Sequence, residues 1–286
     1  MHAPAQPAPL TPRVDPDALL ALWQHEEIRV VAARPRGLED HPDLPVRIRG
    51  AFGRALADRP PPRRADPFGR PRAFDTLFGE GQAPRPFVID VDVRGDVVLV
   101  DLRLFGAARI HADDSREALV AALAGGVALK PRGMRVPFAP LDCLMRRASP
   151  PWPAPAAREA HVRFLTPLVI RSGGRLSAAP DALLVACVER VNGLAAWSGL
   201  APSFDRAAAR IAAARLSVEA LETIPVRMTR WSQRGGDTPI PVSGFLGAVR
   251  IHGPLGPFAP YLVLARDTHI GSHAAIGFGR VEVALG

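Results

Sequence analysis

The feature that most limits how this chain can fold is a proline-rich break near its middle, with the same order of predicted elements on either side. Residues 148–157 read ASPPWPAPAA. Because proline interrupts helices and is excluded from central strands, we interpret this stretch as a linker. The predicted division is a tail (1–14), an N-terminal domain (15–147), the linker (148–157) and a C-terminal domain (158–286).

In the N-terminal domain, alternating apolar and polar residues predict strands, and apolar residues at helical spacing predict helices. Two alternating runs flank Arg94-Gly95-Asp96, which is typical of a β-hairpin. Asp114 and Glu117 have the spacing of a capping box at a helix start. The predicted strands are 28–33, 87–93, 97–105 and 135–145, and the predicted helices are 48–58 and 115–126.

The C-terminal domain repeats this order with one additional helix. Its predicted strands are 161–170, 224–232, 242–252 and 280–285, and its predicted helices lie near 184–194, 203–220 and 257–269. Each half therefore reads βαββαβ, the element order of a ferredoxin-like unit. The sequence predicts an α+β fold of two tandem ferredoxin-like, RRM-like units.

A glycine-rich loop is predicted just before the last strand. The chain ends HIGSHAAIGFGRVEVALG (269–286), with glycines at 271, 277 and 279. This spacing matches neither the dinucleotide-binding fingerprint nor the P-loop, and a strand-like run follows where both motifs need a helix. Small residues let backbone N–H groups approach phosphates closely. A tight turn that positions the last strand is the alternative interpretation, and the two are compatible.

Composition favours a polyanionic partner. The formal net charge is +8 and the isoelectric point is about 11.0. Lys130 is the only lysine among the 36 basic residues, so nearly all of this charge is arginine, which suits phosphates and base edges. The codon bias of a GC-rich genome is an alternative cause of the arginine content.

Cysteine usage and hydropathy favour a cytoplasmic protein without a metal or cofactor. Cys143 and Cys187 belong to no C-x-x-C pair, which argues against a structural zinc site or a disulfide framework. The first residues lack the apolar core of a secretory signal, and no apolar run is long enough to cross a membrane.

Four segments carry a resemblance to a known family: IRGAFGRAL (48–56), LRLFGAA (102–108), HVRFLTPLVIRSGG (161–174) and the stretch 231–283. They are similar to the CRISPR repeat-processing (pre-crRNA) endoribonucleases of the RAMP superfamily, which are prokaryotic. The chain departs from that pattern at Ser272, where relatives often have lysine. It also departs in its Pro/Arg-rich segment 58–72, where relatives often have cysteines and an aromatic residue.

The resemblance implies metal-independent cleavage of CRISPR precursor RNA within its repeats. The ribose 2′-OH attacks the adjacent phosphate and leaves a 2′,3′-cyclic phosphate and a 5′-OH. The implied partners are the repeat RNA, the mature crRNA and other CRISPR effector subunits. Two alternatives stay open: a non-catalytic RAMP-type subunit that holds crRNA, and an RNA-binding protein unrelated to CRISPR.

Such a reaction needs a general base, a general acid and positive charge at the phosphate, and histidine suits the proton transfers near neutral pH. The resemblance points to His41, where relatives often place a histidine, although its EDHPD surroundings are acidic, and to His269, whose alternative is a packed or capping histidine. The catalytic candidates are therefore His269 and His41. The RNA-binding candidates are Arg49, Arg54, Arg63, Arg64, Arg227, Arg230, Arg234, Gly271, Ser272, His273, Gly277, Gly279 and Arg280.

Overall fold

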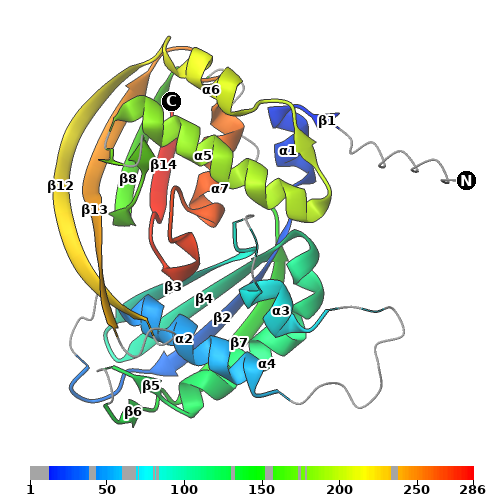
Figure 1. The fold of residues 1–286 in the computed structure, drawn as a ribbon, viewed down its shortest axis with the longest axis vertical. Helices are drawn as coiled ribbons and strands as arrows, with labels where there is room; N and C mark the ends of the chain where they lie inside the picture. The colour runs from blue at the N-terminus through cyan, green and yellow to red at the C-terminus, as the bar shows by residue number, and fades with distance from the viewer. Residues whose placement is uncertain are drawn as a thin grey trace, which may run out of the picture.

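A computed structural model gives the arrangement of most of the chain as two halves, each built on a four-stranded antiparallel sheet (Figure 1). The architecture is α+β, as the sequence predicts. The residues that the structure describes are 13–38, 43–59, 69, 71–79, 81, 84–129, 133–151, 157–172, 175–177, 179–232 and 238–286.

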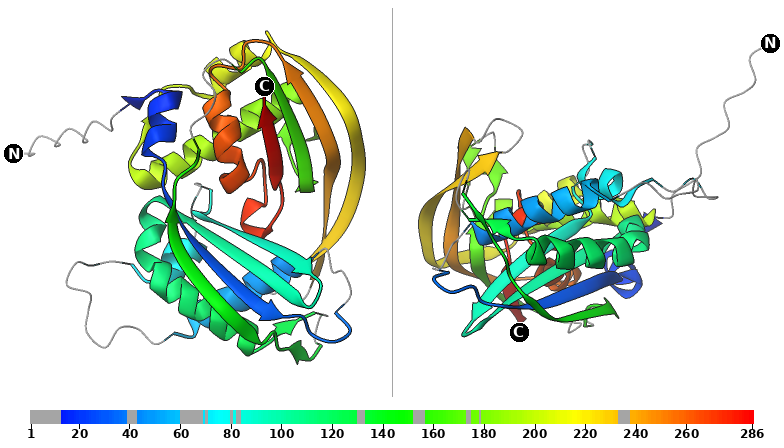
Figure 2. Two further views of the ribbon diagram at one scale, coloured as in Figure 1. Left: turned by 180° about the vertical axis from the view of Figure 1, so that it is seen from behind. Right: turned by 90° about the horizontal axis from the view of Figure 1, so that it is seen from below.

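The N-terminal sheet has the strand order β3-β4-β2-β7. One face carries the apolar side chains of the first core, such as Ile28, Val30 and Val100, because residues of a strand alternate between the two faces. Helices pack on that face (Figure 2). The strands are β2 (His25–Ala33), β3 (Phe87–Arg94), β4 (Val97–Phe105) and β7 (Pro140–Ala148), and the helices are α2 (Leu44–Ala57), α3 (Ala73–Phe78) and α4 (Ala112–Ala124).

The C-terminal sheet has the order β12-β13-β8-β14, which is the same arrangement when the four strands are counted along the chain. Both orders, with antiparallel neighbours throughout, agree with tandem ferredoxin-like units. The strands are β8 (Glu159–Leu168), β12 (Ser217–Ser232), β13 (Thr238–His252) and β14 (Val281–Leu285), and the helices are α5 (Pro180–Ala195), α6 (Arg206–Ala213) and α7 (Ala259–Thr268).

The start of the described chain packs on the C-terminal half. Strand β1 (Arg13–Val14) pairs in parallel with β11 (Ala201–Pro202). Helix α1 (Pro16–Leu22) buries Leu19 and Leu20 in the same core as α7. The remaining short elements are β5 (Val127–Ala128), β6 (Arg135–Val136), β9 (Arg171–Ser172) and β10 (Arg175–Leu176), with 3-10 turns η1 (Gly106–His111), η2 (Ala196–Ser198) and η4 (Ala274–Ile276).

Two local predictions are wrong. The helix expected over 203–220 ends at Ala213, and β12 begins at Ser217, because pairing with β13 sets Val218 opposite Ile251 and long-range contacts override local propensity. The capping box is also absent, since α4 begins at Ala112 and so includes Asp114 and Glu117. The Glu117 carboxylate instead accepts a hydrogen bond from Arg59 at 2.9 Å.

A two-stranded ribbon extends from the C-terminal sheet towards the N-terminal half (Figures 1 and 2). Strand β12 pairs with β13 along its whole length, whereas β8 pairs only with the Phe245–His252 part of β13. The Thr238–Gly244 part of β13 therefore pairs with β12 alone. Met228 and Val242 of this ribbon pack against Phe278 in a small separate core. The ribbon is thereby fixed beside the segment that joins α7 to β14.

Candidate functional site: an arginine-lined cavity beside the glycine loop

The segment between α7 and β14, residues 269–280, closes on itself against the end of β8. The Ile270 N–H donates to the Gly279 carbonyl at 2.8 Å, and the Gly279 N–H donates to the Pro167 carbonyl at 3.0 Å. The Ser272 N–H donates to the Val169 carbonyl at 2.8 Å. We call residues 269–280 the glycine loop; its backbone is held at both ends by hydrogen bonds.

None of the three glycines of this loop can be replaced without displacing neighbours, as Gly271 and Gly277 illustrate. Gly271 has a φ of +78°, and a Cβ there would lie 2.5 Å from the Val169 carbonyl oxygen. Gly277 has a φ of +87°, and a Cβ there would lie 2.7 Å from the Cβ of Pro45 in the first turn of α2. Close approach and left-handed backbone together require glycine at both positions. The loop thus touches both halves of the molecule.

A cavity of about 580 Å³ opens beside the loop, between α2, α5 and α6. Its only carboxylate among the described lining residues is Glu189, which pairs with Arg206 at 2.8 Å. The excess of positive charge suits a polyanion, because a concave, basic surface concentrates anions. The arginines that line the cavity are Arg49, Arg85, Arg171, Arg190, Arg206 and Arg210.

The loop contributes Gly271, Ser272 and His273 to the cavity wall. His273 has a left-handed backbone with a φ of +67°, and its ring lies edge-on to Phe278 with centroids 6.1 Å apart. Among the described histidines, His273 is the one that lines this cavity, and it is half-buried. Histidine at such a place is suited to proton transfer.

His269 lies in a different environment from the one that a catalytic role needs. Its side chain is fully buried, with Nδ1 3.0 Å from the Phe278 carbonyl oxygen and Nε2 3.1 Å from Oδ1 of Asp90. The ring thus lies between the Phe278 carbonyl and the Asp90 carboxylate, away from the cavity. His269, expected at the RNA, is therefore buried and is not among the described residues that line the cavity.

Strand β3 supplies the acidic partners of the loop. Burial by itself raises the pKa of Asp90, but His269, Arg103 and Arg280 outweigh it and hold the pKa below its usual range. Arg280 also forms a bidentate pair with Asp92, with Nη1–Oδ1 at 2.7 Å and Nη2–Oδ2 at 3.2 Å. In this structure the Arg280 guanidinium therefore joins the two halves and does not line the cavity.

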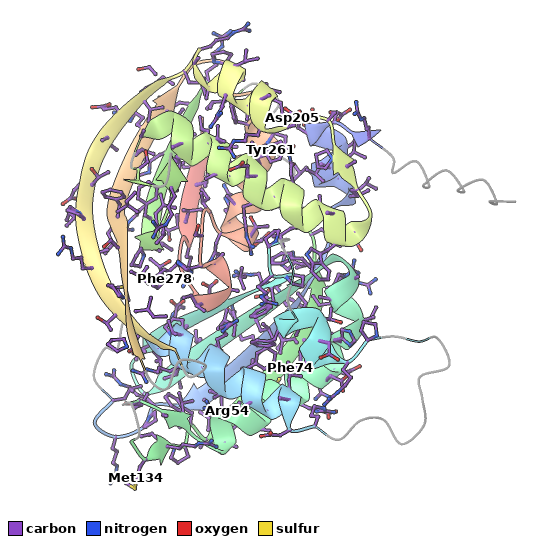
Figure 3. The ribbon with its side chains drawn as sticks, viewed as in Figure 1. Arg54, Phe74, Met134, Asp205, Tyr261 and Phe278 are labelled. Carbon is purple, nitrogen blue, oxygen red and sulfur yellow. The ribbon has the colours of Figure 1, made fainter. Side chains whose placement is uncertain are left out.

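The other predicted arginines are dispersed. Arg49 lines the cavity, with its guanidinium carbon 4.9 Å from the centroid of the Phe78 ring. Arg54 lies on a part of α2 away from Phe278 (Figure 3) and is not among the lining residues. Arg227 is exposed on the face of the ribbon opposite to Met228. His41, Arg63, Arg64 and Arg234 lie outside the described residues, as does the side chain of Arg230.

Sequence reasoning missed Arg85, Arg171 and Arg190 as cavity residues. A signal existed for Arg190, which stands three residues after Cys187 and four before Leu194, on the apolar side of a predicted helix. A charged residue at such a position is buried and needs a partner. Nothing in the sequence around Arg85 or Arg171 marks either residue.

Within the residues that the structure describes, no three His, Cys, Asp or Glu side chains are grouped so that they could hold a metal ion. In the same part of the chain, no helix has both the length and the apolar character that a membrane span requires.

Comparison with known proteins gives a consistent result. The family model described as "CRISPR-associated endoribonuclease Cas6" matches residues 162–281. The solved structure "Cas6 (TTHB231) product complex", a Thermus thermophilus protein, is 17% identical with a TM-score of 0.59, covering 91% of this chain and 99% of that one. "Cas6 (TTHA0078) product complex" is 19% identical with a TM-score of 0.55, covering 91% and 99%.

A Cas6-related protein from Pyrococcus furiosus has a TM-score of 0.52 at 12% identity, covering 92% of this chain and 98% of that one. The search of curated protein sequences gave no match. At these identities the solved structures show a shared fold, and the family model shows the shared sequence pattern.

Proposed function

We propose that the chain is a CRISPR-associated endoribonuclease of the Cas6 family, which binds CRISPR precursor RNA and cuts it within the repeats to give mature crRNA. The observation that carries the proposal is the arginine-lined cavity whose wall includes His273 and the glycine loop. Phosphodiesters fit such a cavity because guanidinium groups bind phosphate oxygens in pairs.

The proposed chemistry needs no metal ion. A base takes the proton of a ribose 2′-OH, the oxygen attacks the adjacent phosphorus, and the bond to the 5′-oxygen breaks. An acid protonates that leaving oxygen, so the products are a 2′,3′-cyclic phosphate and a 5′-OH. The cavity arginines stabilise the negative charge that develops on the phosphate oxygens in the transition state.

We assign the proton transfers to His41 and His273. His273 lines the cavity, and the helix α2 that follows His41 places Pro45 against Gly277 of the loop. Two acid–base groups are what the reaction requires, and neither has to be His269.

His269 has a positioning role in this proposal. Its ring is hydrogen-bonded to the Phe278 carbonyl and paired with Asp90, and so it fixes the loop that presents Ser272 and His273. Arg280 adds a second tie to β3 through Asp92. Loss of either tie is expected to displace the cavity wall without removing an acid or a base.

The test is cleavage of the cognate repeat RNA in EDTA. Wild type is expected to cut, and a repeat with a 2′-deoxyribose at the cut site is expected to survive. His41→Ala and His273→Ala are each expected to lose about 10²–10⁴-fold in rate while still binding RNA, the usual effect of removing a positioned acid or base. His161→Ala is the matched control, because His161 is on β8 and does not line the cavity.

The rival function is a RAMP-type subunit that holds crRNA without cutting it, and Ser272, in place of the basic residue that relatives often have, is the feature that favours it. Tight binding of the repeat without cleavage would select that function. Equal binding of unrelated RNAs would select an RNA-binding protein outside CRISPR biology. If wild type cuts the repeat RNA, we expect the mature crRNA to remain bound to the protein. That complex is the form which other CRISPR effector subunits would bind.

A further inference from the structure

One arginine of the cavity differs from the rest because it is buried. Arg190 of α5 is 8% exposed. Its Nε donates to the Thr268 carbonyl at 3.1 Å, and its Nη1 donates to the Arg85 carbonyl at 3.5 Å. Its Nη2 is buried and has no hydrogen-bond partner among the described residues.

The charge of Arg190 also has no counterion in the described part of the chain. Glu189, the carboxylate of the cavity wall, is paired with Arg206. Burial lowers the pKa of Arg190 to about 10, and no nearby carboxylate opposes that effect. The carbonyl of Thr268 at the end of α7 compensates in part, as the negative end of a helix dipole does.

A buried charge is strongly destabilising unless an opposite charge and hydrogen bonds accompany it. A buried guanidinium that lines a cavity and has one nitrogen without a partner is therefore an incomplete site. A ligand that brings negative charge and several acceptor oxygens would complete it. Phosphate meets both needs, and the planar guanidinium matches its geometry.

We infer that Arg190 forms a phosphate subsite of the cavity, which takes one phosphate group of the bound nucleic acid. The inference rests on the proposed function only in that RNA supplies the phosphate. The other five lining arginines lie around the subsite and contact flanking phosphates. Arg190 is the buried arginine of this set, and its Nη2 has no hydrogen-bond partner among the described residues.

The subsite also connects RNA binding to the glycine loop. Arg190 holds the carbonyl of Thr268, which immediately precedes the loop, and that of Arg85, which precedes β3. A phosphate bound to the Arg190 side chain would fix the guanidinium between the two halves. The loop and β3 would then be ordered together when RNA binds.

The test uses inorganic phosphate, so it does not depend on the RNA. Thermal unfolding of the full chain is measured in sodium phosphate and in sodium chloride at constant ionic strength. Wild type is expected to gain Tm in phosphate in a saturable way, because a ligand that binds the folded state stabilises it. Arg190→Met is expected to lose that gain, and Arg190→Lys, which keeps the charge without the planar fork, is expected to retain only part of it.

Arg163→Met is the matched control, because Arg163 lies on β8, is paired with Glu282 and does not line the cavity. It is expected to keep the full phosphate effect. In chloride, Arg190→Met is expected to be at least as stable as wild type, since the substitution removes a buried charge that has no counterion. A purely structural arginine would give the opposite result, with lower stability in both salts and an unchanged phosphate effect.

A parallel measurement of RNA binding shows which phosphate occupies the subsite. Non-cleavable repeat RNAs ending in a 3′-OH or a 3′-phosphate are compared for wild type and Arg190→Met. A similar loss of affinity of at least about tenfold for both RNAs assigns an internal phosphodiester, and a loss confined to the phosphorylated RNA assigns a terminal phosphate. An unchanged affinity for both RNAs would overturn the inference.

The two proposals fail separately. Loss of the phosphate effect in Arg190→Met together with no RNA cleavage by wild type would leave the subsite standing and remove the endoribonuclease. Cleavage by wild type together with an undiminished phosphate effect in Arg190→Met would leave the endoribonuclease and remove the subsite.

Discussion

Nε2 of His269 lies 3.1 Å from Oδ1 of Asp90, and both side chains are buried between the glycine loop and β3. The loop comes from the C-terminal half and β3 from the N-terminal half, so this pair crosses the interface. His269 also has a φ of +62° and a ψ of 172°, a backbone region that is populated almost solely by glycine. The imidazole contacts therefore hold a conformation that histidine would otherwise avoid.

Removing the ring is expected to destabilise the protein. His269→Ala should lower the free energy of unfolding by about 3 kcal/mol, because it leaves a buried carboxylate without one of its partners. His269→Gly removes the same contacts but relieves the backbone strain, which costs about 1–3 kcal/mol, and so should be less destabilising. Urea unfolding measures both. Equal losses for the two variants would show that the backbone at this residue carries no strain.

His25 predicts a pH dependence of stability. Burial is the main cause that lowers its pKa from 6.5 to about 4, and three nearby arginines add to it. Between these values the folded state binds fewer protons than the unfolded state, so stability falls as the pH falls from 6.5 to 4. The expected loss is about 3 kcal/mol.

Unfolding measured across that pH range for wild type and His25→Gln tests this dependence, and the variant should lose this part of it. Asp90 acts in a lower range. Because its pKa is depressed, its contribution is present above about pH 4 and is lost as the pH falls further. A slope that is the same with and without His25 would mean that the ring is charged inside the fold.

Glycine substitutions separate backbone strain from close packing. Gly95, in the turn between β3 and β4, has a φ of +54° with open space around it, so Gly95→Ala should cost only the left-handed penalty of about 1–2 kcal/mol. Gly277→Ala carries the same penalty and also forces a Cβ to 2.7 Å from Pro45. Gly277→Ala should therefore be clearly the more destabilising and should also slow RNA cleavage. Comparable losses would indicate that α2 moves aside without cost.

Much of the fold could be predicted because its signals are local. The β3–β4 hairpin follows from alternation around Arg94-Gly95-Asp96, and the repeated element order predicted both sheets. Errors arose where a distant partner decides the structure. Val218 is in a strand because Ile251 pairs with it, although the local sequence favours a helix.

The candidate site was less predictable, since its residues come from separate elements. Arg49, Arg171 and Arg210 belong to α2, β9 and α6, and only the packing of the two halves brings them to one cavity. The position of His269 beside the glycines was visible in the sequence. Its burial was not, because that depends on Asp90 in the other half of the chain.

The salt dependence of RNA binding provides a count of phosphate contacts at the cavity. For single strands, log K falls with log salt concentration by about 0.7 for each phosphate neutralised. Arg210 is exposed and lines the cavity, so Arg210→Met should reduce the slope by about 0.7. The affinity itself should fall most at low salt, where the lost contact is strongest.

The measurement is fluorescence anisotropy of a labelled repeat RNA with a 2′-deoxyribose at the cut site, from about 50 to about 200 mM salt. Arg163→Met is the control, because it removes one positive charge from β8 outside the cavity. Its slope should equal that of wild type, which separates a direct phosphate contact from a change in net charge. Equal reductions in the two variants would mean that RNA senses only the overall charge of the protein, and the cavity would then lose its assignment as the binding site.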